Sequence, residues 1–207
     1  MERRHTTQPT AIETRADGKR YISGHGIVFY REGDKSTEFE LWNDKEGRAV
    51  ERVATGFADR ALMEKHDVRG LFNHDSNHLL GRVGSGTMTL TKDAHGIRYD
   101  IPYDENDPDH KSVAAKMERG DLNGSSFAFT ASARWEREAD GTEVRWLTDG
   151  DLFDMGPVTY PAYGGTTAGM RAGGDIADIR AERETWATRN KDRERMQREM
   201  QSFVLEE

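Results

Sequence analysis

Apolar and polar residues alternate along much of the first 160 residues, with the period of two that is typical of half-buried β-strands. Between residues 10 and 30, two such runs flank Ala16-Asp17-Gly18-Lys19, and the central Asp-Gly pair predicts a hairpin. Further strands are predicted within 69–103, over 126–135 and over 143–147, with turns between them. Strands therefore dominate the predicted fold.

Two short helices interrupt this pattern. Residues 56–65 are typical of a short helix. Asp107 and Pro108 suit the start of a second helix that runs to Arg119, and Gly120 ends it. We therefore expect an α+β fold dominated by an antiparallel sheet. Periodicity alone does not choose between a closed barrel and a sandwich.

The composition divides the chain into four parts. Residues 1–9 are polar and predicted to be disordered, and residues 10–163 form the predicted folded domain. Five glycines among residues 164–174 predict a flexible linker. Residues 175–207 carry 16 charges of nearly balanced sign, and their apolar residues recur at helical spacing in a narrow stripe. This predicted helical tail either packs lightly on the folded domain or recognises another protein.

Charge and composition narrow the class of protein. At 207 residues, with 34% hydrophobic and 33% charged residues, the chain is long enough for one domain with a strongly polar surface. A net charge of −8 argues against nonspecific binding to nucleic acid or anionic membranes. The absence of cysteine excludes a disulfide framework, a thiolate zinc site and a thiol nucleophile. No apolar run has the length of a membrane span, so we expect a soluble cytoplasmic protein.

Three segments place polar groups of complementary chemistry beside apolar residues. They are Leu71-Phe72-Asn73-His74-Asp75, Leu122-Asn123-Gly124-Ser125-Ser126-Phe127-Ala128-Phe129, and Leu152-Phe153-Asp154-Met155-Gly156-Pro157-Val158-Thr159-Tyr160-Pro161-Ala162-Tyr163. Together they offer an imidazole, a hydroxyl and a carboxylate. Nucleophilic acyl transfer needs a hydroxyl that attacks, an imidazole that takes its proton and an anion that orients the imidazole.

Two neighbouring serines compete for the role of nucleophile. In a strand, Ser125 shares a face with Phe127 and Phe129, whereas Ser126 lies on the opposite face. Two phenylalanines on one face predict that this face looks into the core. Ser126 is then the serine that looks outward into a cleft, and it is our candidate nucleophile.

The histidines also allow a different chemistry. His74 and His78 have the spacing that binds zinc on a helix, with Asp75 as a third ligand. Position 75 is Asp where the zinc protease motif has Glu, and the preceding residues are more typical of a strand than of a helix. The simpler interpretation places His74 at a strand end as general base. The other histidines carry no motif and are expected to be structural or on the surface: His5, His25, His66, His95 and His110.

Several short sequence motifs occur in the same order as in one protein family. They are Gly24-His25-Gly26-Ile27-Val28-Phe29, Asn73-His74-Asp75, Leu80-Gly81-Arg82, Gly120-Asp121-Leu122, Ser126-Phe127-Ala128-Phe129, and Asp154 before Pro161-Ala162-Tyr163. This series resembles the prohead (capsid maturation) proteases of tailed double-stranded DNA phages. That serine peptidase family is related in fold to the herpesvirus assemblins. The resemblance covers residues 10–171 in the correct order.

The resemblance implies an assemblin-like β-barrel with surrounding helices and a catalytic triad of His74, Ser126 and Asp154. It implies a head maturation protease that cleaves scaffold, the amino-terminal regions of the major capsid protein, and itself. The enzyme would work in the host cytoplasm inside the assembling prohead, without a metal or organic cofactor. The helical tail could then recognise scaffold, and assembly into a homo-oligomer stays open.

Two positions depart from the family pattern. Asp154 stands where many members carry Glu, and Ala128 stands where Gly is usual. Two other functions also fit parts of the sequence. One is a noncatalytic assembly factor that binds scaffold, although a complete set of Ser, His and Asp weighs against it. The other is a metal-dependent hydrolase built on His74 and His78.

Overall fold

The structure is a computed structural model, and it describes residues 1–6, 8–160 and 173–205. Its contacts divide the chain into two compact units, Met1–Met170 and Arg171–Glu207. The first unit contains β1 (Glu2–Thr6), β2 (Thr10–Thr14), β3 (Arg20–Val28), a 3₁₀ turn (Lys35–Thr37), β4 (Glu38–Asp44), β5 (Gly47–Val53), α1 (Asp59–Met63), β6 (Arg69–Leu71), β7 (Leu79–Arg82), β8 (Thr89–Lys92), β9 (Gly96–Pro102), α2 (Pro108–Glu118), β10 (Gly124–Arg137) and β11 (Glu143–Val158).

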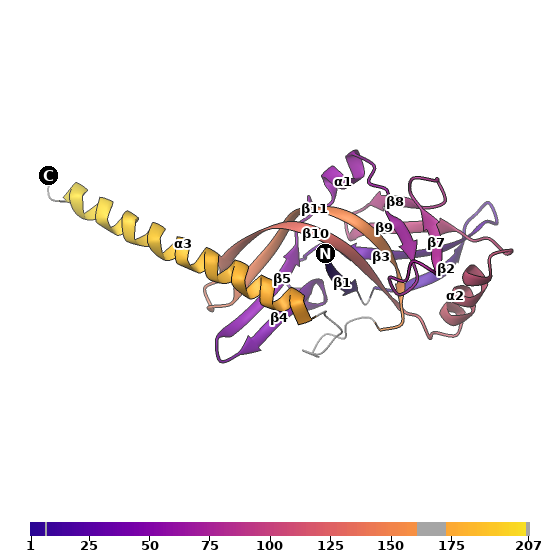
Figure 1. The fold of residues 1–207 in the computed structure, drawn as a ribbon, viewed down its shortest axis with the longest axis horizontal. Coiled ribbons are helices and arrows are strands. Elements are labelled where there is room, and N and C mark those ends of the chain that lie inside the picture. The colour runs from indigo at the N-terminus through magenta and orange to yellow at the C-terminus, as the bar shows by residue number, and fades with distance from the viewer. Residues whose placement is uncertain (7, 161–172, 206–207) are drawn as a thin grey trace. The chain divides into compact units, whose positions relative to one another are not determined.

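The larger sheet is built around the two longest strands. β10 and β11 pair antiparallel and form one long curved hairpin (Figure 1). The strand order is β1-β10-β11-β5-β4, and the short pair β6-β7 joins the same sheet through β11. β5 and β6 both run parallel to β11, on the edge that does not face β10.

The smaller sheet has the order β2-β3-β9-β8 and is entirely antiparallel. β3 connects the two sheets, because Gly24 lies close to the Ser125 side chain and Gly26 lies against Met155. The prediction of an α+β fold rich in strands is confirmed. The two sheets do not close on each other by hydrogen bonding among the described strands, so the predicted closed barrel is not confirmed.

The core lies between the sheets and is made mainly of β-branched and aromatic side chains. Phe57 stands edge-on to Phe129 at a centroid distance of 5.6 Å, and Phe127 stacks on Phe129 at 4.7 Å. All three phenylalanines are fully buried, together with Ile22, Ile27, Tyr99 and Met155. The prediction that Phe127 and Phe129 face the core is therefore confirmed.

Helix α2 shows why the local sequence signals were reliable. The Asp107 carboxylate accepts hydrogen bonds from the backbone N–H of Asp109 at 2.7 Å and of His110 at 3.3 Å. Pro108 occupies the first turn, where a missing N–H costs nothing. Gly120 follows the last turn with φ of +83°, a conformation that favours glycine. Helix α1 is shorter than predicted, because residues 56–58 form a turn before it.

The amino terminus differs from the expectation of disorder over residues 1–9. Residues 2–6 form β1, which pairs antiparallel with β10 between Phe129 and Ser125. Polar composition predicts disorder only when a segment has no partner. Here the unpaired edge of β10 supplies backbone hydrogen bonds, and the buried Glu51 supplies an ion pair to Arg4.

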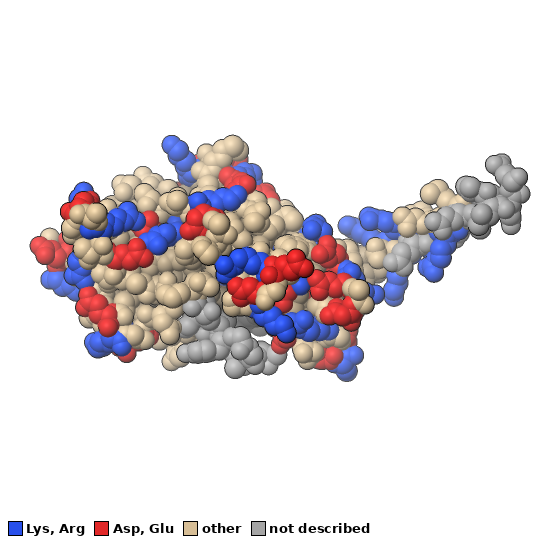
Figure 2. All heavy atoms as spheres, turned by 180° about the vertical axis from the view of Figure 1, so that it is seen from behind, with Lys and Arg blue, Asp and Glu red and all other residues tan. Residues whose placement is uncertain are grey.

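The second unit consists of α3 (Gly173–Leu205), in agreement with the helix predicted from residue 175. Residues 164–172 of the predicted linker lie outside the described residues. In the part of the chain that the structure describes, no helix is both long and apolar enough to span a bilayer. On the face of the molecule in Figure 2, acidic and basic side chains are interspersed and do not form a basic stripe.

The cap of α2 gives a stability prediction. Asp107→Ala removes the carboxylate that accepts from two backbone N–H groups, so unfolding should become easier by about 1 kcal/mol. For a chain of this length we expect a fall in Tm of roughly 2–4 °C in calorimetry. Glu105→Ala is the matched control, since it removes the same charge from the neighbouring loop and should shift stability by less than about 0.5 kcal/mol. Equal Tm values for both variants would contradict the role of the cap.

Candidate active site

Ser126 lies on β10 in a row of small or polar residues. Its partner on β11 is Gly156, and Ala128 is paired with Asp154. Paired residues and residues two apart share a face of an antiparallel sheet. Ser126, Ala128, Asp154 and Gly156 therefore form one patch on the face opposite to Phe127. The small side chains leave room above the patch for another segment.

That segment is the turn after β6, which carries His74. Asn73 and His74 have φ of 57° and 59°, a left-handed conformation that is uncommon outside glycine. Bonds from Asn73 hold the turn in place: its backbone N–H donates to Pro157 O at 3.0 Å, and its amide both donates to Thr159 Oγ1 and accepts from Thr159 N–H. Two strained residues in succession need such support from their surroundings.

His74 bridges the other two candidate residues. Its Nε2 lies 2.6 Å from Ser126 Oγ, and its Nδ1 makes a hydrogen bond with Asp154 Oδ1. The side chains of His74 and Asp154 are only 6% and 9% exposed. A carboxylate at Nδ1 fixes the tautomer in which Nε2 can accept a proton. The arrangement can therefore draw a proton from the serine hydroxyl and stabilise the imidazolium that results.

Ser125 belongs to a buried hydrogen-bond network apart from the candidate active site. Its Oγ is 2.9 Å from the hydroxyl of Tyr99, which also bonds to Thr10 Oγ1 at 2.9 Å. All of these groups are buried, and burial raises the pKa of the Tyr99 hydroxyl to about 12. Ser125 thus bonds to a tyrosine hydroxyl, and it lies on the face of β10 opposite to that of Ser126.

The segment that carries His74 approaches Ser126 from the edge of β11 that does not face β10, because β6 pairs with that edge at Asp154. The turn must cross the face of β11, and it does so at Gly156. A Cβ there would lie 3.1 Å from both Leu71 N and Leu71 C, and closer still to Leu71 O. Real Cβ atoms do not approach a backbone so closely, so any larger residue would lift the turn that carries His74.

The structure brings His74, Ser126 and Asp154 together, but it differs from two of our expectations about their local surroundings. His74 does not end a strand: β6 stops at Leu71, and His74 follows in the left-handed turn. Ser126 does not look into an open cleft either, because it is fully buried, with its Oγ bonded to Arg4 O of the neighbouring strand β1 and close to His74 Nε2. Sequence alternation identified its face correctly, but it could not show what covers that face.

His74 and His78 have different partners. His78 Nδ1 is 3.0 Å from Asp109 Oδ1, beside helix α2, whereas His74 contacts Ser126 and Asp154. Within residues 1–6, 8–160 and 173–205, no three His, Asp or Glu side chains are grouped as metal ligands. The geometry of the described residues therefore favours the serine-centred chemistry over the metal-dependent alternative.

Sequence reasoning missed two neighbours of the site. His5 is the cross-strand partner of Ser126, and its ring packs edge-on to His74 at a centroid distance of 6.1 Å. The backbone oxygen of Arg4 accepts a hydrogen bond from Ser126 Oγ at 2.9 Å. No motif marks either residue, because their position depends on the pairing of β1 with β10. For Asn73, the tolerance of asparagine for left-handed backbone was a usable signal.

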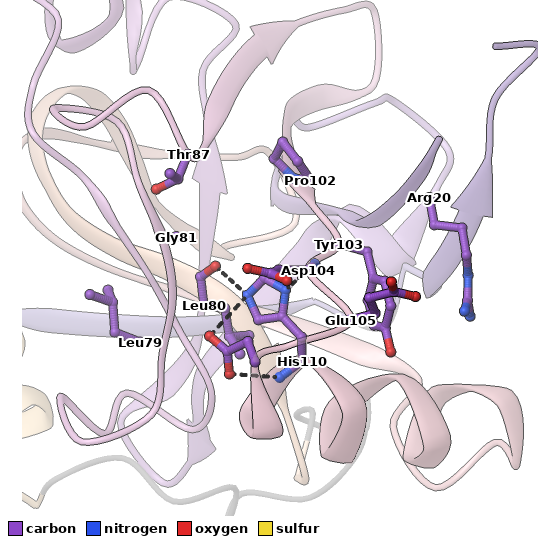
Figure 3. A pocket seen from close by; sticks show the side chains of 11 residues that line it. Arg20, Leu79, Leu80, Gly81, Thr87, Pro102, Tyr103, Asp104, Glu105 and His110 are labelled. Carbon is purple, nitrogen blue, oxygen red and sulfur yellow. Dashed lines mark hydrogen bonds and ion pairs between the residues drawn. The ribbon is translucent and has the colours of Figure 1, made fainter. Parts of the chain in front are cut away.

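A separate surface hollow of about 720 Å³ lies between β7, β9 and the start of α2 (Figure 3). At its base His110 Nε2 donates to Leu80 O at 2.7 Å, and His110 Nδ1 accepts from Asp104 N–H at 3.0 Å. Both ring nitrogens are thus used to connect the loop 102–107 to β7. His74, Ser126 and Asp154 are not among its lining residues.

Comparison with known proteins identifies the family of the chain. Residues 9–176 match the model of the caudovirus prohead serine proteases, and the chain therefore belongs to this family of phage serine proteases. Among solved structures, the chain is similar to the bacteriophage T4 capsid assembly protease, gp21. That likeness has 11% sequence identity and a TM-score of 0.42, and it covers 79% of this chain and 100% of that one. None of the curated proteins matches the chain.

The crossing at Gly156 gives a prediction about activity. Gly156→Ala should lift the His74 turn from Ser126, and a misplacement of about 1 Å can cost on the order of a hundredfold in rate. The rate of labelling by a serine-reactive fluorophosphonate, measured beside Tm, tests this. Gly56→Ala is the control, because its Cβ would meet only Asp59 Oδ2 at 3.7 Å. Wild-type labelling by a folded Gly156→Ala protein would contradict the prediction.

Proposed function

We propose that this chain is the head maturation protease of a tailed phage, with Ser126 as nucleophile, His74 as general base and Asp154 as the group that orients His74. One observation carries the proposal. His74 lies within hydrogen-bond distance of both Ser126 Oγ and Asp154 Oδ1, although the three residues are far apart in the sequence. Membership of the prohead serine protease family supports the same reaction class.

The reaction follows from the positions of the protons. Ser126 Oγ attacks the carbonyl carbon of a peptide bond while His74 Nε2 takes the hydroxyl proton. The same imidazole then gives this proton to the leaving amine, and an acyl-enzyme remains on Ser126. Water attacks the ester with His74 again as base, which releases the carboxylic acid and restores the hydroxyl. Asp154 accepts the hydrogen bond from His74 Nδ1 and stabilises the imidazolium in both steps.

The proposed substrates are the scaffold and the amino-terminal regions of the major capsid protein, cleaved within the prohead, together with the protease itself. Family membership supports a role in capsid maturation. Confinement in a prohead would favour such an enzyme, because enclosed substrates are present at high local concentration. No metal or organic cofactor enters the proposed reaction.

The two serines provide a matched pair of variants. Ser126→Ala should abolish cleavage of co-expressed capsid protein, since loss of a triad nucleophile costs on the order of a millionfold in rate. Ser125→Ala should cleave the same protein normally and lose only about 1 kcal/mol of stability, because it removes one buried hydrogen bond to Tyr99. Intact-mass spectrometry of the capsid protein reads out both. Full processing of the capsid protein by the Ser126→Ala variant would show that Ser126 is not the nucleophile.

The role of Asp154 is tested by a change that keeps its shape. Asp154→Asn retains a hydrogen bond to His74 Nδ1 but favours the wrong tautomer, so kcat should fall by about ten-thousandfold with little change in KM. Asp149→Asn, on the same strand but bonded to Arg60, is the matched control and should keep its activity. Activity that EDTA removes and zinc restores would instead support the metal-dependent alternative.

A further inference from the structure

The hollow between β7, β9 and the start of α2 has the size and lining of a binding site. Its volume of about 720 Å³ lies in the range of ligand-binding clefts. Leu79, which is 45% exposed, lines it together with Pro102 and Tyr103. Single exposed apolar side chains are common, but several that line one concavity are typical of a binding site. In Figure 3, Leu79 and Arg20 lie on opposite sides of the hollow, with His110 at its base.

Three carboxylates belong to the same lining: Asp104, Glu105 and Asp107. Asp104 accepts hydrogen bonds from the backbone and side-chain amides of Asn106, and Asp107 accepts from backbone N–H groups at the start of α2. Among the described residues, none of the three forms an ion pair with a Lys or Arg side chain. Only the His110 ring lies near one of them, 3.8 Å from Asp107. This acidic wall attracts a cation from outside.

The one Lys or Arg residue in the lining already has a partner. Arg20 Nη2 lies 2.5 Å from Glu118 Oε1, and Glu118 is not part of the lining. The Arg20 guanidinium also lies 4.6 Å from the centre of the Tyr103 ring, which shows that this ring accepts a cation on its face. The hollow is therefore complementary to a further lysine or arginine, with apolar surface for the stem and carboxylates for the head group.

The hollow lies next to the segment that carries the candidate general base. Leu79, in its wall, is the first residue of β7 and follows His74 by five residues. Five residues span at most about 18 Å, and the imidazole reaches Ser126 Oγ, so Leu79 lies within about 25 Å of the candidate nucleophile. An extended polypeptide covers that distance in about eight residues. A substrate bound at Ser126 can therefore also reach the hollow.

Side chains of α2 fix this separation. His78 Nδ1 lies 3.0 Å from Asp109 Oδ1, and His110 Nε2 donates to Leu80 O at 2.7 Å. Both contacts tie the end of the loop that carries the general base, and the start of β7, to the first turn of α2. A side chain held in the hollow is therefore held at a constant distance from Ser126. Such an anchor decides which peptide bond of a bound chain meets the nucleophile.

We propose that this hollow is an exosite, which holds a lysine or arginine side chain of the protein substrate up to about eight residues from the bond that is cleaved. This proposal rests on the proposed function of Ser126. The stem of the bound side chain packs on Leu79 and Pro102, and its cation meets Asp104 and Glu105. The exosite stabilises the bound substrate and the transition state equally, so it lowers KM and leaves kcat unchanged.

The first experiment removes two charges and keeps the shape of the hollow. The double variant Asp104→Asn/Glu105→Gln should raise KM for the purified capsid protein roughly tenfold, with kcat within about twofold of the wild type. Calorimetry confirms that the variant is folded. If it is not, Glu105→Gln alone takes its place, with an expected rise in KM of about threefold.

The matched control is Asp140→Asn/Glu32→Gln. Asp140 accepts a hydrogen bond from the N–H two residues further on at 2.8 Å, as Asp104 does, and both control residues are exposed and outside the lining of the hollow. The control variant loses the same charge and should keep the KM of the wild type. Equal KM values for the folded hollow variant and the control variant overturn the proposal.

The second experiment finds the bound side chain on the substrate. Mass spectrometry maps the scissile bond of the capsid protein, and each Lys or Arg within about eight residues of it is changed to Gln in turn. One change should raise KM roughly tenfold with the wild-type enzyme, but less than about twofold with the hollow variant, because the two partners of one contact are not additive. If no basic residue behaves in this way, the proposal is overturned.

Fluorophosphonate labelling separates an exosite from an indirect effect on the triad. The probe reacts with Ser126 without entering the hollow, so the hollow variant and the control variant should label at equal rates. Slower labelling of the hollow variant alone would mean that its charges act on His74 and not on substrate binding, and it would overturn the exosite.

The outcome for the proposed function is separate. If Ser126→Ala stops capsid protein processing but KM does not respond to the charges of the hollow, this inference fails while the proposed protease stands. If processing of the capsid protein does not depend on Ser126, the proposed function itself fails, whatever the hollow binds.

Discussion

The register between β10 and β11 is the constraint on which the rest of the site depends. It places Ser126 opposite Gly156 and Ala128 opposite Asp154, so that nucleophile and carboxylate share one face at neighbouring positions. Because the side chains of a strand alternate, a slip of one residue would turn Ser126 into the core and expose Phe127. The buried phenylalanines on the other face make such a slip very unfavourable, and the hydrophobic core thereby fixes the geometry of a polar site.

The second requirement is that a distant segment reaches this face. The turn after β6 crosses β11 over Gly156 and presents His74 between Ser126 and Asp154. Its left-handed backbone is held by the bonds of Asn73 to Thr159, the residue that follows β11. The strain is thus supported by side-chain contacts that also lock the orientation of the imidazole, which is what a preorganised catalytic group requires.

Much of the secondary structure could be predicted because its signals are local. The cap at Asp107, the turn at Gly18 and the alternation around Phe127 each depend on a few neighbouring residues, and the structure agrees with all three. By contrast, β4 and β5 were not predicted, since their residues carry no clean alternation. Disorder was expected for the residues of β1, because their own composition is polar. The strand is ordered by its contacts with β10 and Glu51, which lie more than forty residues away in the chain and leave no local signal.

The sequence by itself determined which residues could do the chemistry and on which face of its strand Ser126 lies. It did so because residue types, motif order and a period of two are properties of the chain alone. Only the tertiary structure decided that His74 stands within reach of both partners, that the strands form two sheets, and that β1 pairs with β10 beside Ser126. Those features depend on contacts between segments far apart in the chain, whose pairing is set by backbone hydrogen bonds and buried ion pairs that leave no periodic trace in the sequence.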